Sequence, residues 1–206
     1  MNIDLANHPL FAYLLVILPD DWVAAETMKF KHYFKDVYGC SKALSMKPHF
    51  TLSKFVQSDK MEQAIVDHLE KFTRSIKPFD LLLSGFGHFP PHTVYINILN
   101  PSPVVDMVEN IKSAFKHILT GTEQYKPIFV TKPHLTIARG MKDSQHERAW
   151  QEWENKKFEA SFKVEEVVLL KKAIQHDVQD WGKYHAVKTF PFSGSTRQEE
   201  QLSFTL

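Results

Sequence analysis

The sequence has few of the features that mark secreted or nucleic-acid-coating proteins. It contains one cysteine, Cys40, so no disulfide can form within the chain and nothing indicates an oxidising compartment. Its charges nearly cancel, with 25 basic and 24 acidic residues. Proteins that grip long nucleic acids through many phosphates usually carry a clear basic excess. A short anionic ligand needs only a local positive charge, so it stays compatible with this balance.

Long hydrophobic runs are also missing. The apolar run at residues 10–18, LFAYLLVIL, is too short to span a bilayer as a helix. No Lys/Arg-rich segment precedes it and no small-residue cleavage site follows it, as a signal peptide would require. We therefore interpret this run as a buried strand and expect a cytosolic protein without a membrane partner.

Apolar residues are nevertheless plentiful enough for a sizeable core. They make up 43% of the chain, and 16 of them are phenylalanines, which excludes wholesale disorder. The length of 206 residues suits one domain of ordinary size, and no linker or low-complexity segment divides it. We expect a single domain over residues 1–206 and, by default, a monomer.

Hydrophobic periodicity and turn residues predict strands that alternate with helices. Strands are expected at residues 10–18, 48–56, 79–89, 93–99, 133–140, 159–172 and 183–193. Helices are expected at residues 19–39, 58–76, 102–121 and 144–158. The order strand, helix, hairpin occurs once within 48–99 and again within 133–192. This repeat predicts an α+β fold that is bilobal, with two pseudo-symmetric lobes, each an antiparallel sheet with flanking helices, around a central cleft.

A six-residue pattern occurs twice in the chain. Residues 47–52 read KPHFTL, and residues 132–137 read KPHLTI. Each copy is Lys-Pro-His, an apolar residue, Thr and another apolar residue. Both copies lie in predicted strands, 48–56 and 133–139, around which the two lobes would be built.

The alternation of side chains along a strand sorts each copy into two faces. His49 shares one face with Thr51, and His134 shares one face with Thr136, while the intervening apolar residues are expected to point into the core. One His-x-Thr pattern carries little information. Two copies matched on the polar side are not explained by core packing, so the pair is interpreted as functional.

Two facing histidines suit acid–base chemistry near neutral pH, where one imidazole can be neutral and the other protonated. The neutral ring can take a proton from an attacking water, and the protonated ring can give one to a leaving oxygen. The two Thr hydroxyls can donate hydrogen bonds to non-bridging phosphate oxygens. These parts suffice for cleavage of a phosphodiester, and a strained cyclic ribose phosphate needs no metal. Which histidine is base and which is acid stays open.

The doubled motif resembles the signature of the two-histidine (2H) phosphoesterase superfamily, which includes 2′-5′ RNA ligase-like proteins and cyclic phosphodiesterases. Further likeness lies in LLLSGFGHFPPHTVYINI (81–98), in HLTIAR with its Arg139, and in the closing hairpin VEEVVLLKK…YHAVKTFPF (164–192). The resemblance spans most of the chain, but its specificity is confined to the two hexapeptides.

This resemblance implies a bilobal α+β fold and a metal-free hydrolase without a cofactor. It implies that His49 and His134 are catalytic and that Thr51 and Thr136 bind the phosphate. The implied partner is a small nucleotide or RNA terminus with a 2′,3′-cyclic or 2′-5′ phosphate, as in RNA processing. Two alternatives stay open: 2′-5′ ligation of RNA, the reverse chemistry, and a sensor that binds a nucleotide in the same cleft without turnover.

Three aromatic residues are candidates for stacking on a base. Tyr184 is the strongest candidate, because the family resemblance places a strand-borne aromatic residue near the cleft there. Phe86 is a second candidate and Tyr13 a weaker one, and core packing is the competing interpretation for each of them.

Other polar residues are interpreted as structural or solvated. His88 and His92 are spaced like a metal pair, but no supporting ligand accompanies them, so no metal site is expected. Lys54 and Arg139, each five residues after a motif histidine, should point away from the His-Thr face unless the strand bends, and are interpreted as ion-pair residues. The mixed charges of KHYFKD (31–36) indicate a solvated helix face.

Lys47 and Lys132, which precede each Pro-His, have two interpretations. Their ammonium groups could raise the potential near a bound phosphate, or they could be solvated residues at the ends of the strands.

Overall fold

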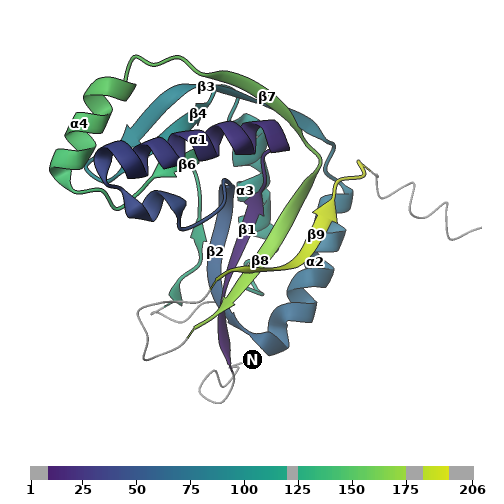
Figure 1. Cartoon of the computed structure of the whole chain (residues 1–206). Helices are drawn as coiled ribbons and strands as arrows, with labels where there is room; N and C mark the ends of the chain where they lie inside the picture. Colours follow the sequence, from purple (N-terminus) through teal and green to yellow (C-terminus); the bar gives the residue numbers. More distant parts are fainter. Residues whose placement is uncertain (1–8, 120–124, 175–182, 195–206) are drawn as a thin grey trace, which may run out of the picture.

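The computed structural model describes residues 9–119, 125–174 and 183–194 (Figure 1). Its strands are β1 (Leu10–Ile17), β2 (Phe50–Ser58), β3 (Phe79–Phe89), β4 (Thr93–Ile98), β5 (Ile128–Phe129), β6 (Leu135–Ala138), β7 (Glu159–Val164), β8 (Glu166–Ala173) and β9 (His185–Pro191). Its helices are α1 (Asp21–Tyr38), α2 (Glu62–Arg74), α3 (Ser102–Ala114) and α4 (Asp143–Trp153), with short 3-10 turns η2 (Ser41–Leu44) and η3 (Asp59–Met61).

The strands form one antiparallel sheet with two halves, and the order of the strands in the sheet differs from their order in the chain. Its order is β7-β3-β4-β6-β2-β1-β8-β9, with β5 paired to β2 at the side. The β6 half consists of β6, β4, β3 and β7, and the β2 half consists of β2, β1, β8 and β9. The two motif strands, β2 and β6, are neighbours at the junction of the halves. The α+β fold with two antiparallel halves and flanking helices, expected from the sequence, is confirmed.

The helices cover one face of this sheet. Each of α1, α2, α3 and α4 contributes residues to a single large core cluster that also holds the buried side chains of the strands. Helix α1 packs on β6 and crosses the β6 half, whereas α2 lies beside β9 in the β2 half (Figure 1). None of the helices in the described ranges is both long and apolar enough to cross a membrane.

The start and end of α1 follow local signals. The Asp20 side chain accepts a hydrogen bond from the backbone N–H of Val23, which caps the first turn. Gly39 ends the helix in the left-handed region with φ 71°. The helix buries Val23, Lys31 and Phe34, so a lysine occupies part of its core-facing stripe.

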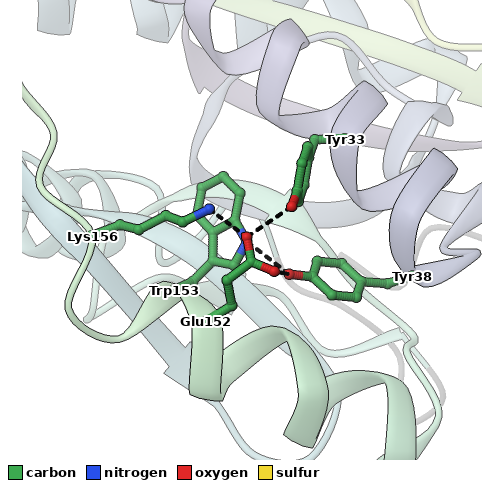
Figure 2. A network of polar contacts seen from close by, with 5 residues as sticks. All are labelled: Tyr33, Tyr38, Glu152, Trp153 and Lys156. Carbon is green, nitrogen blue, oxygen red and sulfur yellow. Dashed lines mark hydrogen bonds and ion pairs between the residues drawn. The ribbon is translucent and has the colours of Figure 1, made fainter.

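A polar network fixes α4 to the end of α1 (Figure 2). Glu152 accepts hydrogen bonds from the hydroxyls of Tyr33 and Tyr38 and pairs with Lys156 at 2.5 Å. Trp153 Nε1 donates to the Tyr38 hydroxyl at 3.1 Å. These contacts hold together two of the helices that cover the β6 half.

The chain order and the spatial order of the repeat differ. The hairpin β3–β4 follows the first motif but joins the β6 half, and the hairpin β8–β9 follows the second motif but joins the β2 half. The strand expected at 159–172 is two strands that separate at Glu165, because β7 pairs with β3 and β8 pairs with β1. Strand β5 and the 3-10 turns were not expected. The helix expected at 102–121 ends earlier, at Ala114, and the described residues 115–118 form a turn, whereas residues 120 and 121 lie outside the described ranges.

Candidate functional site

Pairing of β2 with β6 brings the two motifs together. Phe50 lies opposite Leu135 in an antiparallel register. The residues on either side of this pair therefore also face each other: His49 lies across from Thr136, and Thr51 lies across from His134. Directly opposed Cβ atoms are about 4.5–5.5 Å apart and diagonal ones about 7–8 Å. The two histidines stand on the diagonal of a four-residue patch whose other corners are the two threonines.

The alternation expected for the motifs is confirmed. The four apolar motif residues are fully buried in the core, with exposed fractions of 0% for Phe50, Leu52, Leu135 and Ile137. The histidines and threonines point the other way and are half-buried. We call the side of the sheet that bears His49, Thr51, His134 and Thr136 the motif face.

Both imidazoles are held in the same way by their own motifs. The Nδ1 of His49 lies 2.8 Å from the carbonyl oxygen of Lys47, and the Nδ1 of His134 lies 2.8 Å from that of Lys132. A carbonyl can only accept, so Nδ1–H donates in each ring. The proline between each Lys and His has a fixed φ, which restricts this short loop. Nε2 is therefore the nitrogen left for proton transfer, and the backbone carbonyl of each repeated lysine orients the ring.

The environment lowers the pKa of both histidines. For His49 the main cause is burial, and the positive charges of Lys31, Arg139 and His134 add to it, although the hydrogen bond to the carbonyl opposes them. For His134 the causes are burial and then the charge of Lys132, again against the carbonyl hydrogen bond. Both rings therefore lose their protons more readily than an ordinary histidine.

The hydroxyls of the two motif threonines are open to a ligand. Neither the Thr51 hydroxyl nor the Thr136 hydroxyl has a hydrogen-bond partner in the part of the chain that the structure describes. Each hydroxyl carries one donor and stands across the strand pair from a histidine. Both can therefore donate to an oxygen of an anion bound on the motif face.

A bulge at the same place in each motif strand changes which residues share this face. The pairing registers skip Leu52 in β2 and Ile137 in β6, so each strand has one extra residue directly after its threonine. Lys54 consequently lies opposite Leu14 on the motif face, and Arg139 follows a core-facing residue and returns to the motif face. Within the described ranges neither side chain forms an ion pair with a carboxylate, so their interpretation as ion-pair residues stays a prediction.

An aromatic wall borders the second motif. The rings of Phe89 and Tyr95 each lie 4.9 Å from the ring of His134, and 4.5 Å from each other. The Lys132 ammonium lies over both, 5.1 Å from the Phe89 centroid and 5.7 Å from the Tyr95 centroid. Phe89 and Tyr95 were not identified from the sequence as neighbours of the motif. Lys132 was considered, because it is the first residue of the second hexapeptide.

An apolar wall borders the first motif from the other side. Leu14, Val16 and Val168 form a small buried cluster separate from the main core, and Met46, Leu170 and Tyr184 pack against it. Val16 lies opposite Thr51, so this cluster continues the motif face. Lys172 Nζ lies 4.9 Å from the centre of the Tyr184 ring. The placement of Tyr184 beside the site agrees with the expectation from the sequence, although no structural finding tests its stacking on a base.

Two other aromatic candidates are not at the site. Tyr13 is 0% exposed, stacks on Phe55, and donates its hydroxyl to Glu62. The alternation of β1 places Tyr13 on the core face, and Leu14 takes the motif face. Phe86 packs edge-to-face on Phe30 in the core. The proposals that Tyr13 and Phe86 stack on a base are therefore wrong.

The histidines of the β3–β4 turn do not form a metal pair with each other. His88 stacks on Trp150, and its Nδ1 lies 3.3 Å from Nε2 of His146, beside an open pocket. His92 instead hydrogen-bonds the carbonyl of Met141 through Nδ1. Within the described ranges, no group of three or more His, Cys, Asp or Glu residues could hold a metal ion.

Lys31 is a site neighbour that was not recognised from the sequence. It was assigned to a solvated helix face, yet only 5% of it is exposed. The helical spacing of the sequence does indicate burial, because Lys31 lies on the same face of α1 as the buried Val23, Thr27 and Phe34. The mixed charges of residues 31–36 obscure this periodicity in the sequence.

Comparison with known proteins identifies related sequences. The sequence model of the 2′-5′ RNA ligase superfamily matches residues 19–174. A candidate phosphoesterase of Bacillus licheniformis is 26% identical over 102 residues, which cover 48% of this chain and 56% of that protein. A candidate phosphoesterase of Bacillus thuringiensis is 29% identical over 102 residues, 48% of this chain and 55% of that protein. The chain thus spans about half the length of the curated relatives it matches.

Solved structures share the fold at low sequence identity. LigT of E. coli, in complex with 3′-AMP, aligns with a TM-score of 0.63 at 13% identity, covering 90% of this chain and 98% of LigT. TT0787 of Thermus thermophilus aligns with a TM-score of 0.61 at 14% identity, covering 90% of this chain and 100% of that protein. At such identities the likeness establishes the fold alone.

Proposed function

Since the chain belongs to the 2′-5′ RNA ligase superfamily, we propose that it is a metal-independent phosphodiesterase. Its proposed substrates are 2′,3′-cyclic phosphates or 2′-5′ phosphodiesters of nucleotides or RNA ends. Phosphoesterase chemistry is what its family and relatives support, and the choice of substrate and mechanism is our inference from the site.

One observation carries the proposal: the antiparallel pairing of Phe50 with Leu135. It places two histidines on one diagonal of the motif face and two threonines on the other. In-line displacement at phosphorus needs a base on one side and an acid on the opposite side. A diagonal separation of about 7–8 Å between Cβ atoms leaves room for a phosphate between the two rings.

The chemistry follows from the free Nε2 atoms. The neutral imidazole accepts a proton from water, whose oxygen forms the new bond to phosphorus. The bond from phosphorus to the ribose oxygen breaks, and the protonated imidazole donates its proton to that oxygen. After the step the two rings have exchanged protonation states. Solvent protons restore the starting states.

The remaining groups of the motif face would stabilise the charge that develops on the phosphate. The hydroxyls of Thr51 and Thr136 are oriented to donate to its non-bridging oxygens. Arg139, which the bulge in β6 returns to this face, supplies a fixed positive charge near His49. The wall of Phe89 and Tyr95 and the wall of Tyr184 flank the phosphate with surfaces for a base or ribose.

A substrate panel tests the proposal. The purified protein is incubated in EDTA with the four nucleoside 2′,3′-cyclic phosphates and with a 2′-5′-linked dinucleotide, and products are separated by chromatography. We expect hydrolysis of at least one of them to a phosphomonoester, at a rate that EDTA does not lower. A single product isomer would show which ribose oxygen leaves.

Other outcomes separate the alternatives. Joining of RNA ends with a 2′-5′ bond, without net hydrolysis, would favour ligation. Binding of AMP by calorimetry, with no product after hours, would favour a sensor. Loss of all turnover in EDTA, restored by a divalent ion, would contradict the metal-independent mechanism. Cytosolic location and the monomeric state remain predictions, checked by fractionation and by light scattering.

A further inference from the structure

Lys31 is buried with most of its hydrogen-bonding capacity unused. The side chain comes from α1 and is 5% exposed. Its Nζ donates to the carbonyl oxygen of Ala43 in η2, at 2.9 Å. An ammonium group has three donors, yet in the described ranges Lys31 forms no other hydrogen bond and no ion pair with a carboxylate.

The titratable and charged groups that face Lys31 come from three other segments. Arg139 follows β6, Cys40 follows α1, and His49 precedes β2. Cys40 Sγ contacts the carbonyl oxygen of Arg139 at 3.7 Å, so η2 and the end of β6 lie together. Burial, and then the charge of Arg139, lower the pKa of Lys31 to about 8, although Cys40 acts in the opposite direction.

This cluster has an excess of positive charge. Lys31 and Arg139 both lower the pKa of His49, after burial as the main cause. A buried charge without a counter-ion destabilises the folded state, because it has lost its hydration without compensation. A bound anion would provide that compensation. Two members of the cluster, His49 and Arg139, lie on the motif face, where the threonine hydroxyls are also free to donate to an acceptor.

We infer that Lys31 is the buried counter-charge for the anionic group of the ligand, stabilising a phosphate on the motif face from behind His49. This inference rests on the proposed function for the identity of the anion, and extends it to a residue outside both motifs. Lys31 is here a binding residue that the protein keeps at some loss of its own stability. Protonated Lys31 favours the anion and neutral Lys31 does not.

Calorimetric binding of sulfate tests the inference, because sulfate resembles phosphate and keeps its charge between about pH 7 and pH 9.5. The proteins are the wild type, Lys31→Met, Lys31→Gln and Lys35→Met. Lys35 is an exposed lysine one turn along the same helix, and serves as the matched control. The series is repeated in a Cys40→Ser background, which removes the neighbouring thiol that acts on the pKa of Lys31.

We expect Lys31→Met and Lys31→Gln to bind sulfate about tenfold more weakly at pH 7, and Lys35→Met to bind like the wild type. Wild-type affinity should fall as the pH rises through about 8, and both Lys31 variants should lose that fall. Glutamine keeps a donor for the Ala43 carbonyl but no charge. Full affinity in Lys31→Gln alone would mean that the hydrogen bond matters and would overturn the inference.

The stability of the unliganded protein gives an independent readout. Because the pKa of Lys31 is lower in the folded state than in the unfolded state, the unfolded chain binds more protons between about pH 8 and pH 10. The free energy of unfolding should therefore rise with pH in this range, and Lys31→Met should lose this rise while melting at least as high as the wild type at pH 7.

These results can be told apart from those of the substrate panel. Lys31-dependent sulfate binding in a protein that hydrolyses no substrate would leave this inference standing and remove the proposed function. Turnover together with sulfate affinities within twofold for wild type and Lys31→Met would overturn the inference and leave the function. Absence of sulfate binding by the wild type would also overturn it.

Discussion

Each catalytic candidate is oriented by residues of its own hexapeptide. In both motifs the lysine carbonyl receives the Nδ1–H of the histidine two residues later, at 2.8 Å. The orientation of His49 and His134 thus depends on local backbone and not on a distant side chain. Such a self-contained unit can be repeated in diverged surroundings, because it needs only a backbone carbonyl two residues before each histidine and the restricted backbone of the proline between them.

The pH dependence of turnover should reflect the lowered pKa values of His49 and His134. One ring must be neutral and the other protonated, so kcat/KM should follow a bell with its maximum between the two free-enzyme pKa values. Because burial is the main cause that lowers both, the maximum should lie below about pH 6.5, the ordinary value for histidine. The profile is measured on the preferred substrate of the panel.

The Lys31→Met variant provides a control for this profile. Removing the positive charge near His49 should raise the pKa of that ring, so the limb of the bell that belongs to His49 should move to higher pH. An optimum at or above about pH 7.5 in the wild type would contradict the arrangement, as would an unchanged profile in the variant.

At the scale of elements, the two bulges decide which residues share the motif face. If side chains alternated between the two faces without a bulge, Lys54 and Arg139 would point to the core side of their strands. The extra residue after each threonine reverses this. Alternation itself was predictable from the sequence, since every motif residue from His49 to Leu52 lies as expected. A bulge depends on how two strands pair, so its position could not be read from one strand alone.

Strand β3 supports the aromatic wall through a glycine. A Cβ added at Gly87 would lie 2.6 Å from both Asn97 Oδ1 and the Tyr95 ring. We expect Gly87→Ala to displace Tyr95, which packs on His134, and to lower kcat at least several-fold while costing about 1–3 kcal/mol of stability from overpacking. Turnover and the melting temperature are measured together.

Gly85, two residues earlier in β3, provides the matched control. It has φ 61° but nothing within 4 Å of an added Cβ, so Gly85→Ala strains the backbone without touching the wall. That variant should lose about 1–2 kcal/mol of stability and keep its turnover. Equal losses of kcat in both variants would mean that the wall plays no part in turnover.

For the whole molecule, the exchange of hairpins ties the halves together. The strand order places β3 and β4 beside the second motif strand and β8 and β9 beside the first. Local periodicity predicted most of these elements, because each buries one face and exposes the other. It could not predict their partners, since long-range pairing depends on the whole core. The separation of β7 from β8 at Glu165 was not predicted for the same reason, because it depends on long-range pairing: β7 pairs with β3 in one half and β8 pairs with β1 in the other.

The same contrast holds for the candidate site. The four motif residues were predictable because the pattern occurs twice. Lys31, Phe89 and Tyr95 were not recognised, because each lies far from the motifs in sequence and only packing brings it near. Tyr13 is not a site residue, because neighbouring residues of β1 point to opposite faces of the sheet. Leu14 points to the motif face and Tyr13 therefore points into the core.

The most direct test of the two-histidine account is the rate of hydrolysis in EDTA for wild type, His49→Ala and His134→Ala. The substrate is the member of the panel turned over fastest, and His32→Ala, at an exposed position of α1, is the control. The account predicts a loss of about 10²–10⁴-fold in each motif variant, unchanged folding by circular dichroism, and no loss in the control. Retention of the wild-type rate by either motif variant would contradict it.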